Sequence, residues 1–409
     1  MSPSTTPTRT GGRLLGPVDV GPVAHGGHCV ARLDPEPGQE RGRVLFVRHT
    51  LPGERVLVRV TDDSHASFWR ADAVEVVRPS PDRVEPTCPV AGPGLCGGCD
   101  FQHVDLDAQR RLKTAVVAEQ LQRLADIDWR GEVVGVSTPE TVDGLHWRTR
   151  MRYHVDDEGR AALRGHRSHE LVVLPADGCP IADRRTPTVV GQRWPTGSEL
   201  VTAAAPGQNA LLLDGRVQQG SAELTEQAAG RSWTVAADGF WQVHPAAAAT
   251  LVAAVLEGLE PRQGERAFDL YCGVGLFAGA LADAGCEVWG LELGHRAILT
   301  ARQNLGDVSE RVHLRADRVE RGLARLPRRA DLVVLDPPRS GAGKQVMAAL
   351  LDRHPRAVAY VACDPAALAR DLGTAARLGY AAVDIRGFDL FPMTQHVECV
   401  AILAPQGPN

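Results

Sequence analysis

The segment Arg266-Ala-Phe-Asp-Leu-Tyr-Cys-Gly-Val-Gly-Leu-Phe277 decides the fold of this chain. Its first half reads as a strand, and its second half opens a helix. Gly273 and Gly275 stand between the two, where residues without a side chain let the backbone turn closely around a ligand. A strand, a glycine turn and a helix in this order predict the first unit of a ligand-binding α/β sheet.

Strands and helices alternate in the same way from residue 266 towards the end of the chain. The segments that read as strands are 266–271, 287–292, 312–317, 331–336, 358–361, 381–391 and 397–403. This alternation predicts a doubly wound, Rossmann-like parallel sheet. In such sheets ligands gather at the carboxyl ends of the strands.

Polar side chains stand where three of these strands end. Glu292 closes the second strand and can accept hydrogen bonds from ribose hydroxyls. Asp336 closes the fourth strand. Cys363 follows the fifth and would face the cleft at its carboxyl end, although most free cysteines are only small buried hydrophobic residues.

The glycine turn alone does not separate dinucleotide-binding enzymes from S-adenosylmethionine-dependent methyltransferases. Ala278 stands where the dinucleotide fingerprint has its third glycine. The compact pattern from Asp269 to Gly275, together with Asp336-Pro-Pro338, favours the methyl donor. The Asp-Pro-Pro sequence also occurs in amino-methylating enzymes, but those place an aromatic residue next, where this chain has Arg339.

The N-terminal part of the chain has a different pattern, with short strands separated by Gly and Pro. The candidate strands are 18–20, 27–33, 42–47, 54–60 and 68–77. Five short strands predict a small all-β barrel of the oligonucleotide-binding (OB) type. Gly26-Gly27 and Pro52-Gly-Glu-Arg-Val56 resemble the TRAM domain of RNA-modifying enzymes, although a purely structural barrel is also open. Residues 1–10 are polar and predicted to be disordered.

Four cysteines form a candidate metal site between these two parts. Cys88, Cys96 and Cys99 lie close in sequence, and Cys179 follows some eighty residues later. Gly97-Gly98 lets Cys96 and Cys99 reach one centre. Four thiolates can ligate an iron–sulfur cluster or a zinc ion, and spacing separates the two poorly. Unligated structural cysteines are the remaining interpretation.

Composition indicates a globular protein without a general affinity for polyanions. The 409 residues carry a formal net charge of −5, with 44% hydrophobic and 23% charged residues. Nucleic-acid binding therefore requires a local basic patch. The best candidate is the strand Trp147-Arg-Thr-Arg-Met-Arg-Tyr-His154, with a solvated strand face as the alternative. We see no signal peptide and no apolar run that could span a bilayer, so we expect a cytoplasmic protein.

Seven motifs in order resemble the bacterial RNA 5-methyluridine (uracil-C5) methyltransferase family, whose members carry an iron–sulfur cluster and often a TRAM domain. They are Cys96-Gly-Gly-Cys99, Trp147-Arg-x-Arg150, Phe240-x-Gln-Val243, Asp269-Leu-Tyr-Cys-Gly-x-Gly275, Asp336-Pro-Pro-Arg339, Tyr360-Val-x-Cys363 and Phe391-Pro-x-Thr-x-His-Val-Glu398. The resemblance runs from residue 11 to about residue 405.

The resemblance implies a role for each motif residue. Cys363 would add to C6 of uracil, and Glu398 would remove the C5 proton after methyl transfer from S-adenosylmethionine. The residues expected to hold the cofactor, with Gln242 and Asp336 also positioning uracil, are Gln242, Tyr271, Gly273, Gly275, Glu292, Asp317 and Asp336. Cys88, Cys96, Cys99 and Cys179 would hold a 4Fe-4S cluster, with zinc as the less favoured alternative.

This chain departs from the family pattern beside the proposed nucleophile. Asp364 stands where the family usually has Asn. An ionised carboxylate there would raise the pKa of the thiol and oppose thiolate formation. Ala362, Met393 and His244 replace a usual Ser, His and Asn, and none of these changes removes a required group.

The sequence thus predicts three domains. Residues 11–79 form the TRAM barrel, residues 80–235 an α+β central region with the cluster and RNA contacts, and residues 236–409 the methyltransferase domain. The expected substrate is rRNA or tRNA, with no membrane partner. The alternatives are an RNA cytosine-5 methyltransferase, whose N3-protonating acid is missing here, and an RNA-binding module without catalysis.

Overall fold

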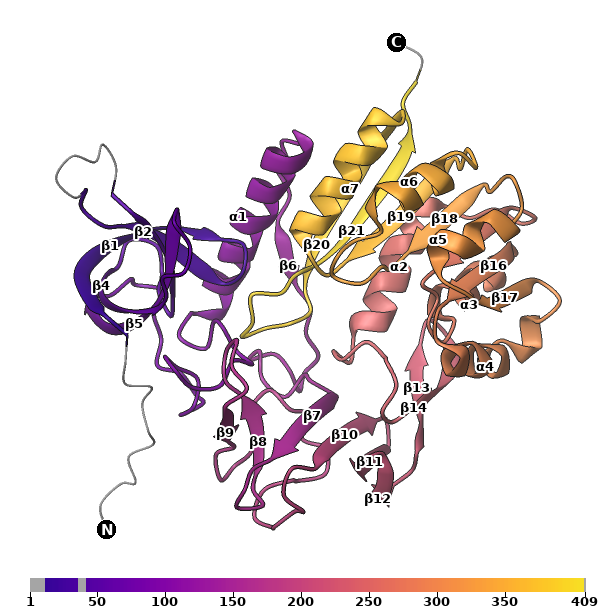
Figure 1. Cartoon of the computed structure of the whole chain (residues 1–409). Coiled ribbons are helices and arrows are strands. Elements are labelled where there is room, and N and C mark those ends of the chain that lie inside the picture. Colours follow the sequence, from indigo (N-terminus) through magenta and orange to yellow (C-terminus); the bar gives the residue numbers. More distant parts are fainter. Residues whose placement is uncertain (1–11, 36–41, 408–409) are drawn as a thin grey trace.

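The computed structural model describes residues 12–35 and 42–407 of the chain (Figure 1). The polar segment 1–10, for which disorder is predicted, lies outside the described residues. In the parts that the structure describes, none of the helices combines the length and the apolar character needed to cross a membrane.

The N-terminal part is a closed five-stranded barrel, as predicted. Its strands are β1 (Leu14–Ala24), β2 (His28–Arg32), β3 (Val44–Arg48), β4 (Arg55–Asp62) and β5 (Phe68–Arg78), hydrogen-bonded in the order β1-β2-β3-β5-β4. Alternate residues point inward, so small apolar side chains such as Val47, Val56, Val58 and Ala71 fill its core.

The long helix α1 (Leu106–Ala125) links the barrel to the rest of the molecule. It begins at Asp105, whose side chain accepts hydrogen bonds from the backbone amides of Asp107 and Ala108, and it ends at Asp126 in a left-handed conformation. α1 packs against α7 (Pro365–Arg377) of the C-terminal domain (Figure 1). The sequence alone predicts a helical run from Leu106 to Ala125, and these bounds agree with it.

The central region is built from antiparallel strands. Its six-stranded sheet has the order β12-β11-β10-β7-β8-β9, and β13 and β14 form a separate hairpin. The strands are β7 (Arg150–Val155), β8 (Ala161–Arg164), β9 (Leu171–Val173), β10 (Glu199–Ala205), β11 (Gln208–Leu213), β12 (Arg216–Gly220), β13 (Glu223–Ala228) and β14 (Arg231–Ala236). The three proposed domain boundaries are not tested by this arrangement and stay predictions.

The C-terminal part is an eight-stranded sheet of order β17-β16-β15-β18-β19-β21-β20-β6. Its strands are β6 (Val133–Gly135), β15 (Arg266–Leu270), β16 (Glu287–Glu292), β17 (Val312–Ala316), β18 (Leu332–Leu335), β19 (Ala357–Ala362), β20 (Tyr380–Asp389) and β21 (Glu398–Pro405). Every neighbouring pair is parallel except those that include β21. The doubly wound fold is confirmed, with one antiparallel strand added.

The antiparallel direction of β21 follows from the short connection before it. Only residues 390–397 separate β20 from β21. A parallel connection needs a crossover of about a dozen residues or more, so this chain can only turn back as a hairpin. The start of β21 therefore lies at the same edge of the sheet as the carboxyl ends of the parallel strands.

Helices cover both faces of this sheet and bury its strands. The helices are α2 (Ala247–Leu259), α3 (Leu276–Asp283), α4 (His295–Asn304), α5 (Val319–Gly322), α6 (Gly343–Leu351) and α7. One apolar core contains side chains of α2 and α3, and the other contains side chains of α1, α6 and α7. β18 and β19 are buried along their whole length, which holds their carboxyl ends in fixed positions.

Candidate active site

Three chemically active side chains meet at the carboxyl edge of the C-terminal sheet. Asp336 follows β18, Cys363 follows β19, and Glu398 is the first residue of β21. The register pairs Ala362 with Cys399, so Cys363 and Glu398 lie at neighbouring strand ends. Residues that the sequence separates are thus brought together by the strand order and by the reversal before β21.

The Cys363 thiol is half-buried and is protonated at neutral pH. Burial raises its pKa to about 11, helped by the carboxyl groups of Glu398 and Asp336, while the Arg339 guanidinium acts in the opposite direction. The thiolate is the nucleophilic form of cysteine. Cys363 could therefore act as a nucleophile only after it loses this proton.

Glu398 is buried beside Cys363, and its burial favours the protonated form. Its side chain is 3% exposed. Burial raises its pKa well above the ordinary value, and the Asp336 carboxyl raises it further. Burial raises the pKa of Asp336 as well. Two neighbouring carboxyl groups of this kind hold a proton near neutral pH, which suits a group that accepts and releases protons.

Asp364, the residue that departs from the resemblance pattern, has a structural role beside Cys363. It caps α7, with its Oδ1 accepting a hydrogen bond from the Ala367 amide at 2.8 Å. Its Oδ2 lies 3.0 Å from Nε2 of His25, which belongs to the barrel. Although burial opposes ionisation, these two hydrogen bonds hold the pKa of Asp364 below its usual value. The ionised carboxylate contributes to the high pKa of the thiol.

The loop that leads into Glu398 is held by the first helix, through residues that the sequence analysis missed. Lys113 is 1% exposed, and its Nζ donates to Oδ1 of Asp389 at 2.5 Å and to the Phe391 carbonyl at 3.0 Å. Gln109 accepts a hydrogen bond from the Met393 amide at 2.7 Å. A signal for Lys113 does exist in the sequence, because it is one of only two lysines among many arginines.

The glycine turn after β15 has the shape of a ligand cradle. Tyr271, Gly273 and Gly275 all have positive φ angles of 66°, 52° and 97°. A Cβ on Gly273 would meet no atom within 4 Å, so this glycine faces open space. The Gly273 amide donates to Oε2 of Glu292 at 3.3 Å. The turn and the acid at the end of β16 are therefore tied together around that space.

Three further polar residues of the sequence motifs or strand ends differ in their surroundings. Asp317 follows β17, and its carboxylate accepts hydrogen bonds from the guanidinium groups of Arg321 and Arg325. Gln242 is half-buried in the loop between β14 and α2. Asp269 is buried inside β15, where its Oδ1 has no hydrogen-bond partner and burial raises its pKa to about 8. Such an unsatisfied buried atom is the kind of feature found at functional sites.

The four cysteines line one cavity of about 310 Å³. Backbone or side-chain amides point at two of the sulfurs, from Gly98 to Cys96 at 3.4 Å and from Gln102 to Cys99 at 3.7 Å. Within residues 12–35 and 42–407, no three His, Cys, Asp or Glu side chains are close enough to hold a single metal ion. A tetrahedral zinc site needs sulfurs about 3.8 Å apart, from Zn–S bonds of about 2.3 Å. The described residues thus place the four cysteines around one cavity without forming a single-ion site.

The basic strand expected to contact phosphates is only partly available for that role. Arg150 is buried, and its guanidinium donates to Glu226 at 3.2 Å and to the Ala236 carbonyl at 2.9 Å. Arg152 is exposed but forms an ion pair with Glu199. The expectation that these arginines form one RNA-facing row is therefore wrong for Arg150, because that side chain ties β7 to β13 and to the end of β14.

Two protein-family models match segments of this chain. The family described as tRNA (Uracil-5-)-methyltransferase matches residues 221–406. The TRAM domain matches residues 16–74. The two matches cover the C-terminal sheet and the N-terminal barrel.

Whole-length relatives agree with these matches. An uncharacterized RNA methyltransferase of Streptomyces avermitilis is 49% identical over 95% of this chain and 98% of that protein. One from Streptomyces coelicolor is also 49% identical, over 95% of this chain and 92% of that protein. The crystal structure of Pyrococcus abyssi tRNA (uracil-54, C5)-methyltransferase with S-adenosyl-L-homocysteine covers 95% of this chain and 99% of its own, with a TM-score of 0.69 and 22% identity. At that identity it establishes a shared fold.

Proposed function

Because the chain belongs to the tRNA (uracil-5-)-methyltransferase family and carries a TRAM domain, we propose that it methylates C5 of a uridine in RNA through a covalent bond to Cys363. The observation that carries this proposal is the meeting of Cys363, Glu398 and Asp336 at one sheet edge. A glycine turn for the methyl donor lies at the carboxyl edge of the same sheet.

The reaction needs a nucleophile because C5 of uracil is unreactive until C6 is attacked. The Cys363 thiol loses its proton to solvent, and its sulfur bonds to C6, which pushes the electron pair of the C5–C6 double bond into an enolate. S-adenosylmethionine would supply an electrophilic methyl group, which C5 takes up as S-adenosylhomocysteine departs. Glu398 in its carboxylate form then takes the C5 proton. The C–H electron pair re-forms the double bond, and Cys363 leaves as thiolate.

The high pKa values in the free site fit these steps. Glu398 is poised to hold a proton, so it can take one from C5. Arg339 lowers the pKa of both Cys363 and Glu398 and would stabilise their ionised forms when uracil excludes water. The two protonated groups must first lose protons, which makes the reaction faster as pH rises.

The cofactor-binding roles follow from the cradle around Gly273. Glu292 would accept hydrogen bonds from the ribose hydroxyls, since its carboxylate is already fixed by the Gly273 and Gly294 amides. Tyr271 and Asp317 would contact the adenosyl part, with Asp317 oriented by its two arginines. Gln242 and Asp336 would lie between the methyl donor and uracil.

Cys88, Cys96, Cys99 and Cys179 would hold a 4Fe-4S cluster, which would supply a structural cross-link between the 88–99 loop and residue 179. The shared cavity and the amides aimed at two sulfurs support this assignment. Anaerobically purified protein is expected to be brown, with absorbance at about 400 nm. A colourless protein with stoichiometric zinc contradicts it.

The substrate is proposed to be tRNA or rRNA in the cytoplasm, with tRNA to be tested first. The Pyrococcus abyssi structure is named for uracil 54 of tRNA. The test is mass mapping of methylated nucleosides in tRNA and rRNA from a deletion strain against the parent strain. Loss of 5-methyluridine at one site supports the proposal. Loss of 5-methylcytidine, or no loss at all, favours the cytosine-5 or the binding-module alternative.

A further inference from the structure

His396 lies two residues before the proposed base Glu398, and no step of the proposed reaction uses it. Its Nε2 lies 3.2 Å from Nη2 of Arg339, and its Nδ1 lies 3.2 Å from the side-chain amide of Gln395. The Phe391 ring meets the imidazole edge-on, with the ring centroids 6.1 Å apart. His396 therefore connects the loop that leads into β21 with the loop that follows β18.

The chemistry of the two partners fixes where this imidazole carries its proton. A guanidinium group has only donors, so Nε2 of His396 accepts the hydrogen bond from Arg339. A neutral imidazole has one acceptor nitrogen and one donor nitrogen, so Nδ1 carries the proton. It donates to the oxygen of the Gln395 side chain, which a half-turn of the amide brings to face it.

The surroundings of His396 keep the imidazole in this neutral form. Burial lowers its pKa to about 3. The nearby cations Arg339, Lys113 and Arg148 act in the same direction, against the carboxylate of Asp364. A protonated imidazole would have two donors and would repel the guanidinium. Near neutral pH, His396 is therefore an acceptor for Arg339.

The loop that carries His396 is fixed to the barrel side of the molecule. The His396 amide donates to Oγ1 of the buried Thr394 at 3.2 Å. The Gln395 amide donates to Oδ2 of Asp100 at 3.2 Å, and Asp100 pairs with Arg48 of β3 at 3.3 Å. A side chain can orient a partner only when its own backbone is held, and these contacts meet that condition.

Arg339 needs such a partner because its side chain is exposed. Its backbone lies in a turn after β18, where the Gly341 amide donates to the Pro338 carbonyl at 2.8 Å. Among the side-chain hydrogen bonds of the described residues, the bond to His396 is the one that Arg339 makes. An arginine side chain has many rotamers. Without the acceptor, its charge would be spread over many positions.

The position of this charge matters because Cys363 is surrounded by acids. Three carboxyl groups raise the pKa of its thiol beyond the effect of burial, those of Glu398, Asp336 and Asp364. The Arg339 guanidinium lowers the pKa of the thiol and also that of Glu398. The attraction between charges falls with distance, so this effect depends on where the guanidinium is held.

We propose that His396 is a positioning residue of the active site, which holds the Arg339 guanidinium beside Cys363 and Glu398 by accepting its hydrogen bond. His396 does not touch the reacting atoms and acts through Arg339. The inference rests on the proposed function for its effect on turnover, whereas its effect on the thiol is measured without RNA.

The test uses the full-length holoprotein with His396→Phe, which keeps a ring beside Phe391 and removes the acceptor nitrogen. His396→Gln is the conservative variant, since its side-chain oxygen can accept the same hydrogen bond. His169→Phe is the matched control, because His169 is exposed in the turn between β8 and β9. Thermal unfolding of every variant is compared with wild type, and His396→Leu replaces His396→Phe if that variant does not fold.

The first measurement is the rate at which iodoacetamide alkylates Cys363 at pH 8.5, followed on the Cys363 peptide by mass spectrometry. His396→Phe is expected to slow alkylation about two- to threefold, because a displaced guanidinium no longer lowers the thiol pKa and less thiolate is present. His396→Gln should react at nearly the wild-type rate. A purely structural loosening of the loop would instead expose the thiol and speed its alkylation.

A double-mutant cycle shows whether His396 acts through Arg339. Arg339→Gln alone should slow alkylation at least as much as His396→Phe does. His396→Phe added to Arg339→Gln should then change the rate by less than about 1.5-fold, since no guanidinium remains to be positioned. Effects that multiply would show that the two residues act independently and would contradict the proposal.

Turnover separates this inference from the proposed function. If the wild type methylates RNA, His396→Phe is expected to lower kcat about 10-fold, with the affinity for S-adenosylmethionine unchanged and His396→Gln close to wild type. If the wild type methylates no RNA but the alkylation rates and the cycle come out as expected, the positioning role stands and the methylation proposal fails. If His396→Phe is alkylated as fast as His169→Phe, or faster, the positioning role is refuted whatever the turnover.

Discussion

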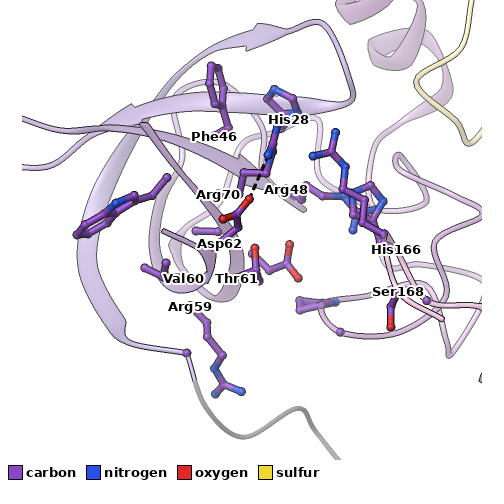
Figure 2. A pocket seen from close by; sticks show the side chains of 18 of the residues that line it. His28, Phe46, Arg48, Arg59, Val60, Thr61, Asp62, Arg70, His166 and Ser168 are labelled. Atoms are coloured by element: carbon purple, nitrogen blue, oxygen red, sulfur yellow. Dashed lines mark hydrogen bonds and ion pairs between the residues drawn. The ribbon is translucent and has the colours of Figure 1, made fainter. Parts of the chain in front are cut away.

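The edge of the C-terminal sheet and the cleft beside the barrel differ in how their ionisable groups are surrounded. At the sheet edge, burial raises the pKa values of Cys363 and Glu398 and so favours their neutral forms. In the cleft between the barrel and the turn 165–168 (Figure 2), Arg70 pairs with Asp62 at 3.2 Å, and the acids Asp63, Asp72 and Glu170 line the same cleft. Groups whose pKa is raised by burial suit proton transfer, whereas charges paired at a surface stay solvated. The comparison teaches that burial, more than the kinds of residue present, sets the chemistry of each region, and the two regions are joined where His25 contacts Asp364.

Removal of the thiol should have the largest effect and would test whether chemistry belongs only to the sheet edge. Cys363→Ala is expected to lower turnover at least about 1,000-fold, because Cys363 is the proposed nucleophile for C6. It should also abolish the covalent adduct with 5-fluorouridine-containing RNA on a denaturing gel. RNA binding should be unchanged. Cys286→Ala, a buried cysteine before β16, is the control, and an adduct that persists in Cys363→Ala would refute the assignment.

Replacement of the proposed base should separate the two halves of the reaction. Glu398→Gln is expected to lower turnover about 100- to 10,000-fold while a covalent protein–RNA complex accumulates. Because the Glu398 carboxyl raises the thiol pKa, its loss should also speed alkylation of Cys363 by iodoacetamide at pH 8. Normal turnover in this variant rules out the base role.

Disruption of the buried Lys113–Asp389 ion pair beside the 390–397 loop should lower the stability of the fold. Lys113→Met leaves the buried Asp389 carboxylate with only the more distant Arg110 guanidinium, 4.0 Å from its Oδ2, which is expected to cost about 3 kcal/mol in the free energy of unfolding. Urea denaturation measures this loss. The double change Lys113→Met with Asp389→Leu should recover much of it, since no unpaired charge remains. Equal destabilisation in both variants would show that the charge is not the cause.

The contact between the two regions should give the smallest effect, seen in the pH profile. The reacting thiol must lose a proton, and its pKa is raised to about 11, so kcat/KM is expected to increase from pH 7 to pH 9. Asp364→Asn keeps a side chain that can cap α7 but removes a negative charge beside the thiol. The profile should therefore move about 0.5 pH unit toward lower pH. A shift to higher pH contradicts this sign.

Much of the fold follows from local patterns in the sequence. The sequence predicts the strands and helices of the C-terminal sheet, the barrel and helix α1, because apolar periodicity and glycine turns act within a few residues. The antiparallel direction of β21 is harder to predict from the sequence, since it depends on the length of the 390–397 connection. The basic strand shows the limit of such patterns, since Arg150 looks like an RNA contact until its buried partners are known.

By itself, the sequence determined the doubly wound sheet, the barrel and the candidate residues Cys363, Glu398 and Asp336. Only the tertiary structure decided that Glu398 adjoins Cys363, that Asp364 contacts His25, and that Lys113 pairs with Asp389. The physical reason is the distance along the chain over which each kind of interaction acts. Periodicity and turn chemistry are local, whereas burial, pKa values and clusters of like charge arise from residues far apart in the chain that packing brings together.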